Sequence, residues 1–294
     1  MKNTYFAPAK INLYLRIVGR RTDGYHDIET LFQRIALYDH LTIEEGPIGG
    51  SPFRLAVIGE GLEDDDLDKN LVARAWEELS LACPFAMGPV RVVLDKRIPV
   101  GAGLGGGSSD AASTLMALRD MFSLPLDNAA LRSIGARLGA DVAFFLGPPC
   151  AIGRGIGDDL TPVEQSSRFW VVLAFPPFRV STRKVYQRYD PAAPHEAPDL
   201  GALLEAIRRG DAEGAIRCAF NEMESLAFGI RPELGVLREQ LEALAGRPVR
   251  MSGSGSTLFT LFGEEEEARI AAERICQERF PGVATLVTTF HTEK

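Results

Sequence analysis

Cysteine and histidine are scarce in this chain, which has 294 residues and four of each. The cysteines lie far apart and form no Cys-x-x-Cys pair; they are Cys83, Cys150, Cys218 and Cys276. We therefore expect reduced, buried thiols rather than a disulfide framework. No two histidines are four residues apart, so a zinc site is not expected, and no residue is assigned as a metal ligand.

An excess of basic residues and a long apolar run are also missing. Lys and Arg total 32 and Asp and Glu total 40, which gives a net charge of −8. This balance argues against a nucleic-acid partner, which needs a broad basic face, but it leaves room for a small anionic ligand. No apolar stretch approaches the ~20 residues that span a bilayer, and the N-terminal residues lack the apolar segment of a signal peptide. We expect a cytoplasmic protein without a membrane partner.

The composition is that of a folded protein, with 46% hydrophobic and 24% charged residues. At roughly 150 residues per domain, the length suggests two domains. A segment rich in glycine and proline at 147–157 suggests the boundary and gives domains at 1–155 and 156–294. Strand and helix patterns occur in both parts, which favours an α+β fold with mostly antiparallel sheets.

Hydrophobic periodicity predicts the individual elements. Strands are predicted at 10–18, 31–43 with a break near 38–39, 53–58, 90–94, 170–175, 248–251, 257–262 and 283–289. Helices are predicted at 70–82, 200–209, 212–224, 232–244 and 264–280, and after residue 110, where Ala111, Leu115, Leu118 and Phe122 share one face. The acidic run 64–66 is expected to be a solvated loop, and 191–198 a proline-rich connector or lid.

A glycine-rich loop between a strand and a helix is the most informative segment. Five glycines fall within positions 101–107. Without Cβ atoms, their backbone amides can approach a ligand closely. Ser108, Ser109 and Asp110 are good N-cap residues for the helix that follows. Free N–H groups and the helix dipole at such an N-terminus favour a phosphate.

Other interpretations of this loop are weaker. Gly101, Gly103 and Gly106 satisfy Gly-x-Gly-x-x-Gly, but a dinucleotide site needs an acidic residue ~20 positions on at a strand end, and a proline-bearing loop stands there instead. The chain has no Gly-Lys pair for a Walker A motif and no protein-kinase signatures. A merely flexible turn would not require the entropic cost of five glycines. A loop that binds phosphate is therefore the interpretation that we favour for residues 101–107.

A second glycine cluster, 251–257, lies between two predicted strands. It is typical of a hairpin with small residues, or it offers further N–H and hydroxyl donors. Two such loops in one chain strengthen the prediction of an anion site.

Three segments together resemble a known family. Residues 7–13, 99–112 and 251–257 resemble the first, second and third motifs of the GHMP kinases, in the family's order, and the match covers nearly the whole chain. Residues 20–26, with Gly-Tyr-His at their end, are not shared by the sugar and mevalonate kinases of the family; with 29–33 and 138–142 they resemble a branch that acts on a cytidylyl alcohol. The segment 220–224 departs slightly from that branch, and no role is inferred for it.

The resemblance implies a two-subdomain kinase. Its N-terminal, ATP-binding part is expected to be like domain 2 of ribosomal protein S5, its C-terminal part to be ferredoxin-like, with a cleft between them. The implied reaction is transfer from ATP, with Mg²⁺, to the 2-hydroxyl of a CDP-linked methylerythritol, in the methylerythritol phosphate route to isoprenoids. A monomer or weak homodimer is expected. Another GHMP-type kinase, acting on mevalonate, homoserine or a sugar, or a non-catalytic nucleotide or metabolite sensor, is the alternative.

The resemblance also implies site residues. The ATP phosphates are expected along Pro99, Val100, Gly101, Ala102, Gly103, Leu104, Gly105, Gly106, Gly107, Ser108 and Ser109. Asn70 and Lys96 are expected on the adenine side, although a lysine at a strand end is usually solvated.

The family comparison makes Asp141 the general base, with Lys10 beside it to orient it toward the substrate hydroxyl. Without the family comparison, Asp141 is also compatible with a helix N-cap, and a lysine at position 10 is ordinarily an exposed residue at a strand start. Both residues count against the sensor, which needs neither.

Four residues are expected to bind the acceptor. Tyr25 and His26 would read the cytosine by stacking and hydrogen bonding, although alone they are more typical of a packed turn. Tyr186 is a possible second stacking face, and Asn12 is expected to contact the substrate.

Overall fold

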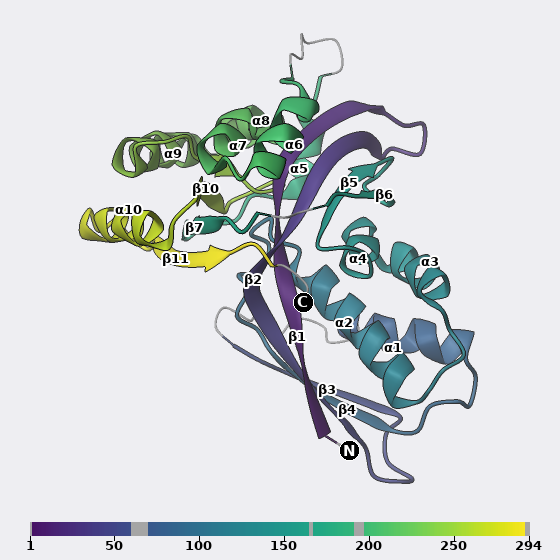
Figure 1. Cartoon of the computed structure of the whole chain (residues 1–294). Coiled ribbons are helices and arrows are strands. Elements are labelled where there is room, and N and C mark those ends of the chain that lie inside the picture. Colours follow the sequence, from purple (N-terminus) through teal and green to yellow (C-terminus); the bar gives the residue numbers. More distant parts are fainter. Residues whose placement is uncertain (1, 60–69, 165–166, 191–196, 292–294) are drawn as a thin grey trace. The chain divides into compact units, whose positions relative to one another are not determined.

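A computed structural model describes residues 2–59, 70–164, 167–190 and 197–291 (Figure 1). The chain forms two compact units. The first contains the N-terminal residues through Ala9, Leu37–Val100 and Gly105–Pro148; the second contains Lys10–Ala36, Gly101–Leu104 and the chain from Pro149 onward. The predicted acidic loop at 64–66, and 191–196 of the predicted connector, lie outside the described residues.

Two long strands contribute to both units, β1 (Lys2–Arg20) and β2 (His26–Glu45). The units are therefore not contiguous in sequence, and the family-domain boundary after residue 155 stays a prediction. The expected break in β2 near residues 38–39 is wrong. Asp39 is fully buried there, but its carboxylate accepts hydrogen bonds from the backbone N–H groups of Arg97 and Ile98, so the strand continues through a satisfied polar residue.

In the first unit, the C-terminal half of β2 pairs antiparallel with β4 (Val90–Asp95), and β4 pairs parallel with β3 (Phe53–Ile58). The described residues of this unit form four helices as well: α1 (Leu71–Ala82), α2 (Gly106–Met121), α3 (Asn128–Leu138) and α4 (Ala140–Phe145). The helices pack against one another, and α1 also contacts β3. Figure 1 shows α2 between α1 and α4, so the glycine loop opens the helix at the centre of this group.

In the second unit, the N-terminal half of β2 pairs with β5 (Cys150–Arg154), which pairs with β6 (Asp159–Pro162), and β1 pairs in parallel with β8 (Phe220–Asn221). The glycine- and proline-rich segment 147–157 is therefore largely a strand and its turn rather than a linker. Among the described pairs, only β1–β8 and β3–β4 are parallel, as a mostly antiparallel fold predicts.

A separate four-stranded antiparallel sheet has the order β11-β7-β10-β9, with β7 (Trp170–Phe175), β9 (Arg250–Met251), β10 (Leu258–Phe262) and β11 (Ala284–Thr289). Its two central strands are apolar except for Thr260, because both of their faces are covered. Alternate residues such as Val172 and Leu258 enter a core formed with α8–α10, while Leu173 and Phe259 are equally buried on the opposite face.

Six helices of the second unit are described: α5 (Thr182–Gln187), α6 (Leu200–Arg209), α7 (Ala212–Cys218), α8 (Met223–Ile230), α9 (Pro232–Ala245) and α10 (Glu265–Gln277). The single helix predicted at 212–224 is wrong. The chain leaves α7 at Ala219, whose backbone is extended, and Phe220 and Asn221 pair with β1 before α8 begins. The backbone N–H of Glu222 also donates to the Leu15 carbonyl, so tertiary pairing overrides local helical periodicity.

The cysteines are only partly as expected. All four are free thiols, but Cys150 alone is buried; its pKa rises to about 12 because burial disfavours the thiolate. Cys276 is exposed, and the other two are half-buried. Within the described ranges, no helix combines the length and apolarity that crossing a membrane requires.

Candidate functional site

The N-terminus of α2 carries no side-chain cap. Its N-cap is Gly105, in the left-handed region with φ of 70°, so the prediction that Ser108, Ser109 or Asp110 caps the helix is wrong; all three lie inside it. The hydroxyl of Ser109 is buried and finds no hydrogen-bond partner in the described part of the chain. An uncapped first turn with an orphaned hydroxyl fits a bound phosphate, which would accept from exactly such groups.

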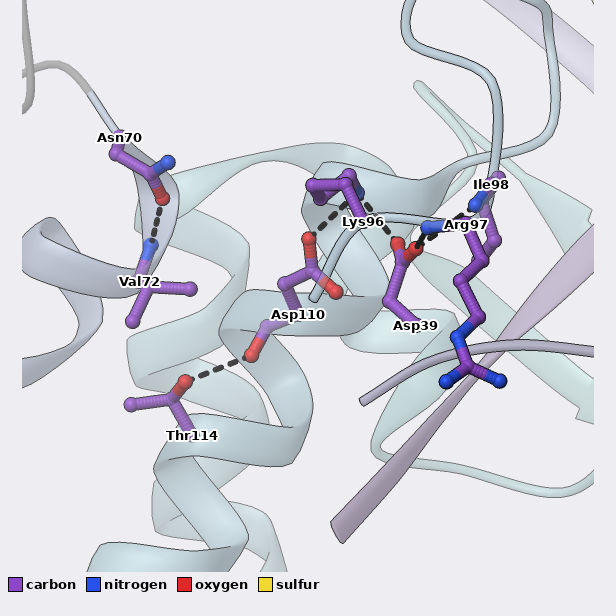
Figure 2. Close-up of polar contacts among 8 residues, drawn as sticks. All are labelled: Asp39, Asn70, Val72, Lys96, Arg97, Ile98, Asp110 and Thr114. Atoms are coloured by element: carbon purple, nitrogen blue, oxygen red, sulfur yellow. Dashed lines mark hydrogen bonds and ion pairs between the residues drawn. The ribbon is translucent and has the colours of Figure 1, made fainter. Parts of the chain in front are cut away.

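Lys96 lies beside this first turn and is buried, not solvated as a lysine at a strand end usually is (Figure 2). Its ammonium donates to Asp110 Oδ2 at 2.8 Å and to Asp39 Oδ2. Asp39 Oδ1 accepts from the backbone N–H groups of Arg97 and Ile98 at 2.6 and 2.8 Å. Strand β2, the end of β4 and helix α2 are thus tied together through one cation.

The ammonium of Lys96 carries one positive charge and faces two buried carboxyl groups, those of Asp39 and Asp110. Burial and the interactions among these three groups shift the pKa values of Asp110 and Lys96. Burial raises the pKa of Asp110 to about 7, against the opposing effect of Lys96 and with a further increase from Asp39. For Lys96, burial alone would lower the pKa, but the carboxylates of Asp110 and Asp39 outweigh it and raise the pKa above its usual value. Lys96 therefore stays protonated, and Asp110 is the residue of the cluster that gains or loses a proton near neutral pH.

Helix α2 approaches this cluster so closely that a side chain on its first residue would displace neighbouring side chains. A Cβ at Gly106 would lie 3.0 Å from Ile98 Cγ2 and 3.1 Å from Lys96 Nζ. Asn70, the other predicted adenine residue, uses its carboxamide oxygen to cap α1 through the N–H of Val72 at 2.9 Å. Figure 2 shows this cap apart from the Lys96 cluster. The adenine-side assignment of Asn70 and Lys96 stays a prediction.

In the second unit, Lys10 lies inside β1 and is only 4% exposed, so the alternative of an exposed strand start is wrong. Its ammonium donates to Asn12 Oδ1 at 2.6 Å and lies 5.6 Å from the centre of the Phe32 ring. Asn12 in turn donates from Nδ2 to Thr30 Oγ1 at 2.8 Å, and that hydroxyl donates to the Tyr14 carbonyl. The chain of hydrogen bonds holds both predicted site residues in one orientation.

The two glycine-rich loops meet in the second unit. The 251–257 loop joins β9 to β10 as a hairpin, and it also contacts residues 101–104: Ser252 Oγ donates to the Gly103 carbonyl at 2.9 Å and Thr257 N to the Ala102 carbonyl at 3.2 Å. Gly103 has φ of 79°, and a Cβ there would lie 2.1 Å from the Ser252 carbonyl oxygen. Only glycine permits this approach.

An aromatic cluster contains two of the predicted base-binding residues. The His26 ring stacks on Tyr186 with 4.8 Å between ring centroids and 19° between planes, and Tyr189 meets His26 edge-on. Burial, with a contribution from Arg20, lowers the pKa of His26, which favours the neutral ring. Tyr25 is 63% exposed, so the packed-turn alternative does not hold for it.

Asp141 is the second residue of α4, whose N-cap is Gly139. The alternative that Asp141 caps a helix is therefore wrong. Asp141 and Lys10 belong to different units, and their joint action stays a prediction.

Three polar residues of these clusters were not identified from the sequence: Asp39, Thr30 and Tyr189. Asp39 offered one signal, an acidic residue inside the predicted strand 31–43, which predicts a break there. The others offered none, because their partners are distant in sequence.

The described residues contain no group of three or more His, Cys, Asp or Glu side chains able to hold a metal ion.

Comparison with known proteins places the chain among kinases. The family model "GHMP kinases N terminal domain" matches residues 70–147, and "GHMP kinases C terminal" matches 203–282. A homoserine kinase from Cytophaga hutchinsonii shares the fold, with a TM-score of 0.75 and 16% identity over 99% of this chain and 94% of that one.

Closer relatives carry a more specific name. The 4-diphosphocytidyl-2-C-methyl-D-erythritol kinase of Moorella thermoacetica is 40% identical over 96% of both chains, and that of Syntrophotalea carbinolica is 39% identical over 92% of this chain and 94% of its own. A crystal structure of a 4-(cytidine 5'-diphospho)-2C-methyl-D-erythritol kinase superposes with a TM-score of 0.81 at 37% identity, covering 99% of this chain and 100% of that one. The chain belongs to the GHMP kinases, small-molecule phosphotransferases, and within them to the family of the 4-diphosphocytidyl-2-C-methyl-D-erythritol kinases.

Proposed function

We propose that the protein transfers the γ-phosphoryl group of ATP to the 2-hydroxyl of 4-diphosphocytidyl-2-C-methyl-D-erythritol, giving the 2-phosphate and ADP in the methylerythritol phosphate route to isoprenoids. Membership of the family supports the reaction. The observation that carries the substrate assignment is the His26 ring stacked on Tyr186, an aromatic surface suited to a nucleobase.

The glycine loop and the start of α2 are proposed to bind the ATP phosphates. The uncapped first turn and the orphaned Ser109 hydroxyl support this, since they supply donors without protein acceptors. Mg²⁺, when bound with the nucleotide, would neutralise charge on the phosphates. Asn70 retains its Nδ2 group for the adenine, whereas the ammonium of Lys96 is already shared by two carboxylates.

The acceptor is proposed to bind through its cytosine and its alcohol. Tyr25, His26 and Tyr186 would hold the base; the neutral imidazole can both donate to and accept from its edge. Asn12 would contact the alcohol portion. Its carboxamide is oriented by Thr30, so a fixed polar group is available without reorganisation.

Asp141 is proposed as the general base and Lys10 as the cation that orients it. The hydroxyl oxygen attacks the γ-phosphorus, its proton passes to the Asp141 carboxylate, and the bond from phosphorus to the bridging oxygen breaks to release ADP. A tertiary alcohol is a hindered and weakly acidic acceptor. Positioning is therefore expected to contribute more to the rate than the basicity of the carboxylate does.

A coupled ADP-release assay on the full chain tests the proposal, with the CDP-alcohol, mevalonate, homoserine and galactose as acceptors. We expect turnover with the CDP-alcohol alone. Preferred turnover of another acceptor would favour a different GHMP-type kinase, and ATP binding without turnover on any of them would favour a sensor.

The Asp141→Asn variant tests the general base. We expect kcat to fall by about 10²–10⁴-fold, the usual contribution of a general base. Asp120→Asn, which alters an exposed carboxylate in α2, is the matched control and should keep wild-type kcat. Near-wild-type turnover in folded Asp141→Asn would remove the base assignment.

A further inference from the structure

The segment to which sequence comparison assigned no role, 220–224, contains a buried carboxamide with all of its hydrogen bonds directed at backbone. Asn221 is 4% exposed. Its Nδ2 donates to the carbonyl oxygens of Met251 and Gly253, both at 2.7 Å, and its Oδ1 accepts from the N–H of Met223 at 2.9 Å. One side chain thereby joins the start of α8 to two points of the 251–257 loop.

Glu224, in the same 220–224 segment, also forms a hydrogen bond to the 251–257 loop. Glu224 Oε1 accepts from the backbone N–H of Met251 at 2.7 Å. The loop residue Met251 is therefore held on both its N–H and its carbonyl, by side chains three residues apart across the first turn of α8.

The loop that these side chains hold is in contact with the predicted site residues of the same unit. Ser252 and Thr257 bond to the carbonyls of Gly103 and Ala102, in the predicted phosphate loop. A Cβ at Gly253 would lie 3.4 Å from both Lys10 Nζ and Asn12 Oδ1. The carbonyl bonded by Asn221 thus belongs to the residue that packs on Lys10 and Asn12.

We propose that Asn221, assisted by Glu224, is a positioning residue that holds the 251–257 loop against the phosphate-binding loop and Lys10. The inference rests on the proposed function only for the name of the acceptor. It concerns ATP binding, which any kinase of this fold requires.

The chemistry explains why an amide stands at position 221. Two carbonyl oxygens need two N–H donors and the Met223 amide needs an acceptor, and only a carboxamide supplies both from one end of a side chain. A carboxylate of the same shape would face two carbonyl oxygens with no donor. A leucine of similar volume would leave three buried backbone groups without partners.

The test compares Asn221→Leu with the wild-type chain. We expect the KM for ATP, and the dissociation constant of a non-hydrolysable ATP analogue, to rise 10-fold or more, because the phosphate loop loses its support. Glu224→Ala should show the same change to a smaller degree, and Glu224→Gln should restore wild-type values because its amide oxygen still accepts from Met251.

Leu241→Ala is the control for a purely structural effect. Leu241 is buried in the same core on α9, so this variant should lower the melting temperature while leaving both ATP constants unchanged. If Asn221→Leu and Glu224→Ala also lower only the melting temperature, the inference is wrong. If Asn221→Leu fails to fold, Glu224→Ala and Glu224→Gln test the inference instead. A change in the melting temperature of Glu224→Ala without a change in the ATP constants would contradict it.

This test of the positioning role and the test of the proposed function can fail independently. Absence of wild-type turnover on the CDP-alcohol would contradict the substrate assignment. The analogue's dissociation constants would still judge the positioning role, since they need no acceptor.

Discussion

At the scale of single residues, the Lys96 cluster has the largest electrostatic consequence. Three ionisable groups are buried together with two negative charges to one positive. Asp39 accepts from two backbone N–H groups, and burial raises the pKa of Asp110, so the ionisation of Asp110 is resisted. The stability of the protein should therefore depend on pH in part through the carboxyl group of Asp110.

We predict that the free energy of unfolding decreases as pH rises from about 4 to about 7, by an amount that Asp110→Asn removes. The pKa of Asp110 is raised from 3.8 to about 7, so the native state binds more protons than the unfolded state within this window. Its contribution is complete below the window, is lost as pH rises through the folded pKa and is constant above it. Denaturant unfolding of both proteins between pH 4 and 8 measures the difference.

The variant keeps a neutral side chain of the same shape, so its stability should lack this component of the pH dependence. Asp120→Asn, an exposed change in the same helix, should follow the wild-type curve. Parallel curves for the wild-type protein and Asp110→Asn would show that Asp110 is ionised throughout.

At the scale of elements, the phosphate loop depends on a contact between two backbones. Gly103→Ala would place a Cβ 2.1 Å from the Ser252 carbonyl oxygen at a φ of 79°, so the two loops would have to separate. We predict a rise of 10-fold or more in the KM for ATP, measured in the coupled assay. Because nothing lies within 4 Å of a Cβ at Gly263, Gly263→Ala controls for the loss of a glycine and should keep the wild-type KM. An unchanged KM in Gly103→Ala would show that the loop contact does not support nucleotide binding.

Elements were predicted well where their signal is local. The helices at 70–82 and 232–244 and the strand at 170–175 rest on periodicity, caps and length, and they lie within a residue or two of α1, α9 and β7. The errors arose where a distant partner decides. Residues 219–221 leave a helix to pair with β1, and β2 continues through Asp39 because Arg97 and Ile98 satisfy it.

At the scale of the whole molecule, bound substrates should stabilise the folded chain. A ligand at 100 times its dissociation constant adds about 2.7 kcal/mol, which raises the melting temperature by several degrees in a protein of this size. We predict such shifts with a non-hydrolysable ATP analogue and with CDP, but not with mevalonate, measured by thermal unfolding of the full chain. A shift with mevalonate and none with CDP would contradict the proposed acceptor.

The same measurement separates binding from chemistry. Asp141→Asn should keep both shifts while losing turnover, because a general base acts on the acceptor's proton rather than on nucleotide affinity. Loss of the shifts in this variant would indicate that Asp141 supports binding or folding instead.

Through its resemblance to a family, the amino-acid sequence by itself determined the class of this protein: an α+β kinase with two glycine-rich loops and a helix at the first of them. It also predicts Lys10, Asn12, His26 and Asp141 as site residues. These conclusions follow from short motifs, whose information is local. Only the tertiary structure decided which polar groups are buried and by what they are held. Asp39 and Asp110 share Lys96, and Asn221 reaches across 30 residues to Met251, because such partners are chosen by packing and by the cost of leaving a buried polar group unpaired.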